Sequence, residues 1–144
     1  MKDTKELVRE SVVKIFSGFK SELVKKYRTQ ALTISPMHYR SLQVIKQETG
    51  CTSQHVSNSL NRDKAQIARL IGELVKQGYV ETRPSETDKR NRLLMLTTSG
   101  KEVMKELQSI EKSVMTQMVK GISKAELDQF VTTAKKMAEN ISHT

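Results

Sequence analysis

Apolar positions with helical spacing open the chain. Between about residues 3 and 28 they recur at steps of three and four residues, at Val8, Val12, Ile15, Phe16, Phe19 and Leu23. This spacing places apolar side chains on one stripe of an amphipathic helix. The segment therefore predicts a long first helix with one face available for packing.

Two shorter helices are predicted after it. Ser35 and Pro36 suit the N-cap and first position of a second helix, which Gly50 is expected to close. The segment TSQHVSNSL predicts a third helix that begins near Thr52 or Ser53. A turn at residue 61 then leads into the next periodic segment.

The fourth predicted helix, in DKAQIARLIGELVKQG, is the most informative part of the chain. Asp63 and Gln66 have the spacing of a capping box, and Gly78 suits a C-terminal stop. Its apolar residues share one face and must point inward: Ile67, Leu70, Ile71 and Leu74. The opposite face carries small and basic residues: Ala65, Arg69, Gly72 and Lys76, with Arg62 at the start. Such a face could enter a DNA groove, where Arg and Gln meet base edges, or its charges could simply be solvated.

Two β-like segments follow, YVETR and RLLMLT, and they predict an antiparallel pair. Eight residues, 84–91, join them, so this loop should project. The loop and its edges contain four cations and two acids: Arg83, Lys89, Arg90 and Arg92 with Glu86 and Asp88. A surface turn does not need that many cations, so the loop indicates a negatively charged partner. The third and fourth helices and this pair form a predicted helix-turn-helix with a wing, whose tip could contact the minor groove.

The last two helices carry a second apolar pattern. Thr97 or Thr98 can cap the fifth helix, and Ser123 with Glu126 has capping-box spacing for the sixth. Apolar residues step by threes and fours along both: Val103, Leu107, Ile110, Val114, Leu127, Phe130, Ala134, Met137 and Ile141. The pattern favours shallow packing against a partner chain, with an intramolecular core as the alternative. We expect a mainly α fold with a small β-ribbon, in which residues 35–97 form a winged helix-turn-helix lobe and residues 3–30 and 98–143 form dimerisation helices.

Composition narrows the partners. The chain has 25 Lys and Arg against 16 Asp and Glu, a net charge of +9, which favours nucleic acid, an anionic membrane or acidic proteins. The charged N-terminus lacks an apolar signal region, and the longest aliphatic run is LLML, so we expect a cytoplasmic protein without a membrane partner. The one cysteine fits a reducing compartment.

The segment from Arg62 to Val103 resembles the winged-helix core of the MarR family of dimeric bacterial transcription regulators. The matching features are Asp63-Lys64 at the helix start, an apolar trio before KQGYV, Asp88-Lys89-Arg90 in the wing, and Leu-Thr-x-x-Gly at residues 96–100. The resemblance implies a homodimer that binds a pseudo-palindromic operator in double-stranded DNA. It also implies repression, relieved by a small anionic or aromatic effector.

The resemblance also assigns roles to residues. Ala65, Gln66 and Arg69 match recognition-helix positions that face bases. Arg90 would enter the minor groove, and Asp88 would hold the wing or that guanidinium. Expected phosphate contacts are Ser53, Gln54, Lys64, Lys89 and Arg92, with Arg62 on the same DNA-facing side. The family uses the start of the second helix to line an effector cleft, which nominates His38, Tyr39 and Arg40; alternatively, Tyr39 lies at the core edge and the other two lie near solvent or phosphate.

Other functions remain as alternatives. Cys51 could make the protein a redox-sensing regulator, although a lone cysteine usually behaves as a small buried hydrophobe. The winged lobe could instead be an interaction module that docks an acidic protein.

Two residues of the predicted third helix depart from the family pattern or stand apart from the site. Ser57 replaces a small apolar residue of the family, and His55 is expected at the surface. The sequence nominates no metal site, cofactor or enzymatic centre.

Overall fold

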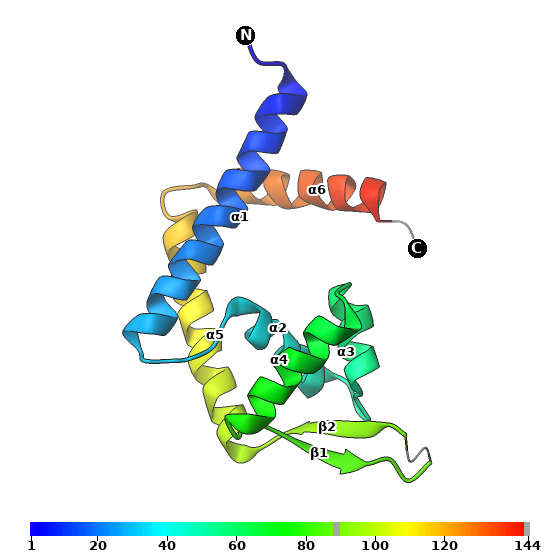
Figure 1. Cartoon of the computed structure of the whole chain (residues 1–144). Helices are drawn as coiled ribbons and strands as arrows, with labels where there is room; N and C mark the ends of the chain where they lie inside the picture. The colour runs from blue at the N-terminus through cyan, green and yellow to red at the C-terminus, as the bar shows by residue number, and fades with distance from the viewer. Residues whose placement is uncertain (88–89, 143–144) are drawn as a thin grey trace.

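The computed structural model of the chain describes residues 1–87 and 90–142 (Figure 1). Its elements follow the predicted order: α1 (Thr4–Thr29), α2 (Pro36–Gln47), α3 (Ser53–Leu60), α4 (Lys64–Lys76), β1 (Val80–Pro84), β2 (Arg92–Leu96), α5 (Thr98–Val119) and α6 (Lys124–Ile141). The predicted fold class, mainly helical with a two-stranded antiparallel wing, is confirmed.

Polar caps explain where the helices begin. Ser35 accepts the His38 N–H at the start of α2, Thr97 accepts the Gly100 N–H at α5, and Ser123 accepts the Glu126 N–H at α6. These contacts satisfy amides that have no partner within the helix. Helix α2 ends at Gln47, so Gly50, with φ of +67°, lies in the turn beyond the helix and does not close it directly as predicted.

The winged lobe, residues 35–97, holds most of the hydrophobic core. Its buried side chains come from the three helices α2, α3 and α4 and from the sheet, and the C-terminal half of α1 and most of α5 complete the same cluster. The apolar face of α4 is buried as predicted: Ile67, Leu70, Ile71 and Leu74. The orientation of α4 is therefore fixed by its apolar face, and its other face is directed to solvent.

The wing is a short antiparallel ribbon. Val80 pairs with Leu96 and Pro84 pairs with Arg92, which leaves residues 85–91 as the connecting loop. The Leu94 N–H donates to the Cys51 carbonyl oxygen at 2.8 Å, so the segment before α3 joins the edge of the ribbon. This contact ties the wing to the helix-turn-helix.

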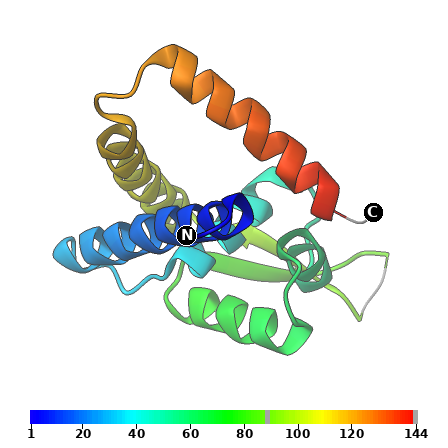
Figure 2. The same cartoon turned by 90° about the horizontal axis from the view of Figure 1, so that it is seen from above.

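The apolar pattern of the last two helices divides between two environments. The α5 positions Val103, Leu107, Ile110 and Val114 are buried in the core of this chain, so the expectation that they face a partner is wrong for them. Helix α6 has no buried residue, and Phe130 is 54% exposed. Figures 1 and 2 show α6 turning away from α5 and lying apart from the winged lobe.

Candidate nucleic-acid interface

Helix α4 presents a small, basic surface to solvent. Ala65, Arg69, Gly72 and Lys76 are exposed, and Gln66 is half-buried on the flank. At the start of the helix the Asp63 carboxylate accepts the N–H groups of Ala65 at 3.1 Å and Gln66 at 3.2 Å. Arg62 and Lys64 are exposed beside this cap. A face without bulky side chains can approach a DNA groove closely, and Arg and Gln can bond to base edges there.

The turn between α3 and α4 is held by Ser57. Its buried hydroxyl donates to the Arg62 carbonyl oxygen at 2.6 Å, and Asn61 adopts the left-handed conformation that reverses the chain. Ser57 occupies a position where the resemblance implies a small apolar residue. The hydrogen bond satisfies the buried hydroxyl, so Ser57 strengthens the turn rather than loosening it.

The start of α3 carries the predicted phosphate contacts. Ser53 is half-buried, and the exposed Gln54 donates to the Asn58 side chain at 2.8 Å. His55 is exposed as predicted, and its Nδ1 accepts the Thr52 N–H at 3.0 Å, which makes it a helix cap. Within the described part of the chain, no three His, Cys, Asp or Glu side chains are grouped as metal ligands would be.

The wing contributes further arginines beside α3 and α4. The Arg92 guanidinium donates to Thr82 Oγ1 at 2.9 Å and 3.1 Å, and Arg83 forms an ion pair with Glu81 at 3.2 Å. Arg90 is exposed in the turn between the strands. Asp88 and Lys89, for which the sequence predicted a wing-holding role and a phosphate contact, lie outside the described residues.

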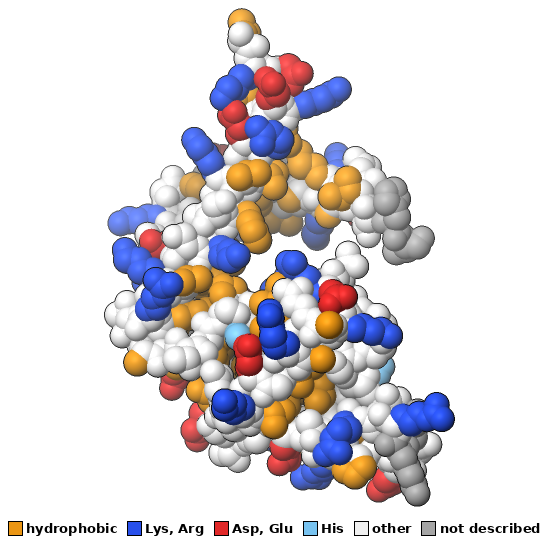
Figure 3. Space-filling model, viewed as in Figure 1, with side chains coloured by type: hydrophobic (Ala, Val, Ile, Leu, Met, Phe, Trp, Pro, Cys, Tyr) orange, Lys and Arg blue, Asp and Glu red, His pale blue; other side chains and the backbone are white. Residues whose placement is uncertain are grey.

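Hydrophobic side chains lie among the charged ones of the winged lobe and also form a patch near α6 (Figure 3). Lys and Arg are spread over the winged lobe and along α1. A groove of about 800 Å³ lies between α1, α5 and α6. Its lining is mainly apolar and includes Ile15, Phe19, Met115, Met118, Leu127 and Phe130. Exposed apolar surface of this kind marks an interaction site in soluble proteins.

The three effector candidates lie in different environments. His38 is buried, which corrects the prediction that it lies near solvent: its Nε2 is 2.6 Å from the Glu73 carboxylate of α4. Tyr39 is only 2% exposed, and Arg40 is exposed. The sequence could not indicate the His38–Glu73 pair, because the two residues are 35 positions apart and belong to different helices.

Tyr39 opens onto a polar pocket of about 560 Å³ between α2 and α5. The other residues that line it are Gln43, Lys105, Gln108, Ser109, Glu111 and Lys112. Burial raises the pKa of Tyr39, and the Glu111 carboxylate adds to that rise. Tyr27 is also buried, and its hydroxyl has no hydrogen-bond partner among the described residues.

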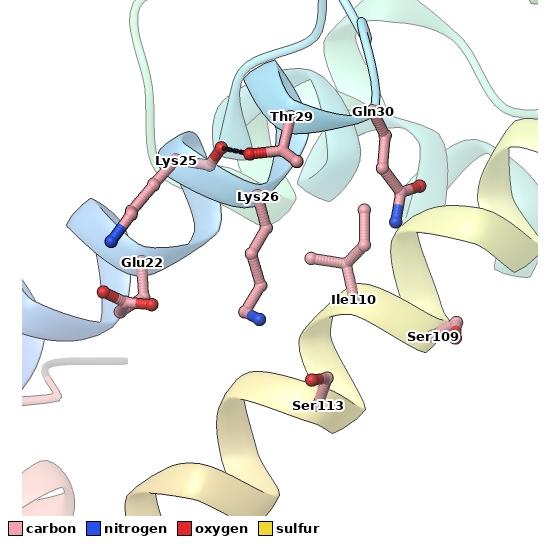
Figure 4. A pocket seen from close by; sticks show the side chains of 8 residues that line it. All are labelled: Glu22, Lys25, Lys26, Thr29, Gln30, Ser109, Ile110 and Ser113. Atoms are coloured by element: carbon pink, nitrogen blue, oxygen red, sulfur yellow. Dashed lines mark hydrogen bonds between the residues drawn. The ribbon is translucent and has the colours of Figure 1, made fainter.

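A second polar pocket, of about 420 Å³, lies between α1 and α5 (Figure 4). Glu22, Lys25 and Lys26 reach it from α1, and Ser109 and Ser113 reach it from α5. None of the three effector candidates lines this pocket.

Cys51 is buried in the core. Its side chain has no exposed surface, and burial, with a smaller effect of Glu48, raises the pKa of the thiol to about 11. A thiol reacts through its thiolate, so this environment opposes redox sensing. Of the helices in residues 1–87 and 90–142, none is both long and apolar enough to cross a bilayer.

Comparisons with known proteins agree with this geometry. The sequence model described as "MarR family" matches residues 32–91, which include most of the winged lobe. The chain is 24% identical to the HTH-type transcriptional regulator BilQ of Clostridium symbiosum over 95 residues, 66% of each protein.

Similar structures extend the likeness to nearly the whole chain. The S. aureus MepR–DNA complex has a TM-score of 0.81 and 20% identity, covering 98% of this chain and all of that one. A MarR transcriptional regulator from Methanosarcina mazei Go1 has a TM-score of 0.81 and 22% identity, with coverage of 94% and 96%. These two likenesses show a shared fold.

Proposed function

Because the chain belongs to the MarR family of winged-helix transcriptional regulators and is therefore a DNA-binding regulator rather than an enzyme, we propose that it is a homodimeric repressor of a pseudo-palindromic operator. The observation that carries this proposal is the exposed face of α4, small and basic, beside a wing that carries arginines. The net charge of +9 supports association with a polyanion.

On DNA, α4 would lie in the major groove. Ala65 and Gly72 allow close approach, and Arg69 and Gln66 would bond to base edges. Arg90 would reach the adjacent minor groove, whose negative potential attracts guanidinium groups. Phosphate contacts would come from the half-buried Ser53 and from exposed side chains around the helix starts and the wing: Gln54, Arg62, Lys64 and Arg92. Lys89 is a further candidate by its place in the sequence. The MepR structure supports this placement, since that relative of the same fold is described in complex with DNA.

A second copy of the chain would fill the apolar groove between α1, α5 and α6. Helix α6 exposes Phe130, Val131 and Ile141, which a single chain leaves in water. Pairing α1, α5 and α6 of two chains would bury this surface. It would also set the two α4 helices about one DNA turn apart, the spacing that a palindromic site requires.

An effector would act by changing that spacing. We place the effector site at the pocket that Tyr39 lines, which lies between α2 of the winged lobe and the long helix α5. Lys105 and Lys112 favour an anionic ligand, and Tyr39 could contact an aromatic ring. A ligand that binds better to a dimer with the wrong half-site spacing would shift the population away from the operator. The cytoplasm is the proposed location of this regulation.

Selection of bound duplexes from random-sequence DNA tests the proposal. We expect one enriched two-fold sequence, and binding to it should weaken steeply with salt, roughly one log-log unit per phosphate contact. Arg69→Ala should reduce the preference for that sequence by about 1–3 kcal/mol. Weak binding without any enriched sequence would instead identify a module that docks acidic proteins.

A further inference from the structure

The DNA-facing side of α4 carries one acid, Glu73, four residues after Arg69. Residues at this spacing are neighbours on a helix surface, so an acid and a base there attract one another. An ion pair between them would occupy the Arg69 guanidinium, and the carboxylate would also be repelled by DNA phosphates. A helix that reads bases through Arg69 therefore needs Glu73 to be held elsewhere.

His38 holds it. The His38 Nε2 lies 2.6 Å from Glu73 Oε2, and the His38 side chain is 11% exposed against 47% for Glu73. The ring is itself oriented, because the Ser35 N–H donates to Nδ1 at 3.1 Å. Since Nδ1 accepts this hydrogen bond, Nε2 carries the ring proton, and the Nε2–H group donates a hydrogen bond to the Glu73 carboxylate. The hydrogen bond therefore runs from a fixed, buried ring to the edge of α4.

Arg69 gains from this arrangement. It is exposed, and among residues 1–87 and 90–142 no hydrogen bond or ion pair engages its guanidinium. All five of its donors then remain for DNA.

A second side-chain contact, from Gln77, also anchors α4. The Gln77 side chain donates to the Thr33 carbonyl oxygen at 3.0 Å and lies 3.2 Å from Thr33 Oγ1. The apolar face of α4 is also buried, with Ile67 and Leu74 completely covered. The helix is therefore held by its core and by Gln77, while the His38 contact acts on the carboxylate of Glu73.

We propose that His38 is a positioning residue for DNA recognition, which holds the Glu73 carboxylate away from Arg69 and so keeps Arg69 available to base edges. This inference rests on the proposed placement of α4 in the major groove. It assigns His38 a role in α4 readout and not in effector binding.

A double-mutant cycle tests it with the full-length chain. The variants are His38→Ala, Glu73→Gln and both together, and the readout is affinity for a duplex selected by the wild-type chain and for a scrambled duplex. His38→Ala should lower affinity for the selected duplex about tenfold when Glu73 is present, which corresponds to ~1.4 kcal/mol. In the Glu73→Gln background the same change should cost less than about twofold, because no carboxylate is released. Any loss of packing or of the α2 cap occurs in both backgrounds and cancels, and thermal melts verify that each variant is folded.

Arg69→Ala distinguishes a failure of the His38 role from a failure of the proposed α4 placement. In that background His38→Ala should have no further effect on affinity. Equal losses with and without the Glu73→Gln substitution, or no loss in either case, would overturn the role of His38. If Arg69→Ala weakens binding but the cycle shows no coupling, only this inference fails. If Arg69→Ala binds like the wild type, the placement of α4 fails and the inference fails with it.

Discussion

Gly100 packs so closely against the backbone of Tyr79 that a Cβ atom at Gly100 would lie 2.0 Å from the Tyr79 carbonyl oxygen. The same carbonyl accepts the Thr97 N–H at 3.1 Å, and the Thr97 hydroxyl donates to the Gly78 carbonyl oxygen at 2.6 Å. These contacts hold the first turn of α5 against the turn that follows α4. Close packing therefore explains the glycine of the Leu-Thr-x-x-Gly segment.

Gly100→Ala should lower the free energy of unfolding by about 1–3 kcal/mol, because backbone must move to admit the methyl group. Gly72→Ala is the matched control: it is also helical, but a Cβ there meets no atom within 4 Å. That variant should gain up to ~1 kcal/mol from helix propensity. Urea unfolding followed by circular dichroism measures both. A Gly100→Ala chain as stable as the wild type would contradict the packing argument.

Arg90→Ala should weaken binding to the selected duplex about tenfold, or ~1.4 kcal/mol, because the wing would lose its proposed contact with the minor groove. Arg83→Ala serves as the control, because it removes another exposed arginine of the wing that belongs to β1 and not to the loop, and it should weaken binding less. Fluorescence anisotropy at fixed salt gives the affinities, and helicity and molecular mass should not change. Equal affinities for wild type and Arg90→Ala would remove the wing from the DNA contact.

Phe130→Glu should separate the proposed dimer into single chains. It places a charge at the exposed aromatic residue of α6, and burying that charge in an apolar interface is costly. Gln129→Glu introduces the same charge at an exposed neighbour that does not line the groove, and it should leave the dimer intact. Sedimentation equilibrium distinguishes one chain from two. A Phe130→Glu protein that remains dimeric would mean that this surface is not the interface.

Cys51 should resist alkylation in the folded chain at pH 8. Burial raises its thiol pKa to about 11 from an ordinary value of 9.0, so the folded state retains the proton and very little thiolate is present. Labelling should accelerate as the pH rises towards 11, and the unfolded chain in guanidinium, with its ordinary thiol, should react readily at pH 8. Rapid labelling of the folded chain at pH 8 would restore the redox-sensing alternative.

The periodicity of the sequence predicted the helices, the ribbon and both faces of α4, because each depends on residues close together in the chain. It predicted an apolar face on α5 but not what covers that face: Leu107 and Ile110 are buried within this chain, whereas Phe130 of α6 remains exposed. The periodicity of the sequence also could not predict the pairing of His38 with Glu73. That contact depends on how two helices pack, and neither residue has a spacing that indicates the other.

We propose that two copies of the basic lobe bind one duplex together. Native mass spectrometry of the chain with its selected duplex tests this most directly, since it counts the chains in each complex. We expect two chains per duplex for the wild type, and no such complex for Phe130→Glu. A chain that is monomeric and does not bind duplex DNA even at low salt would contradict it.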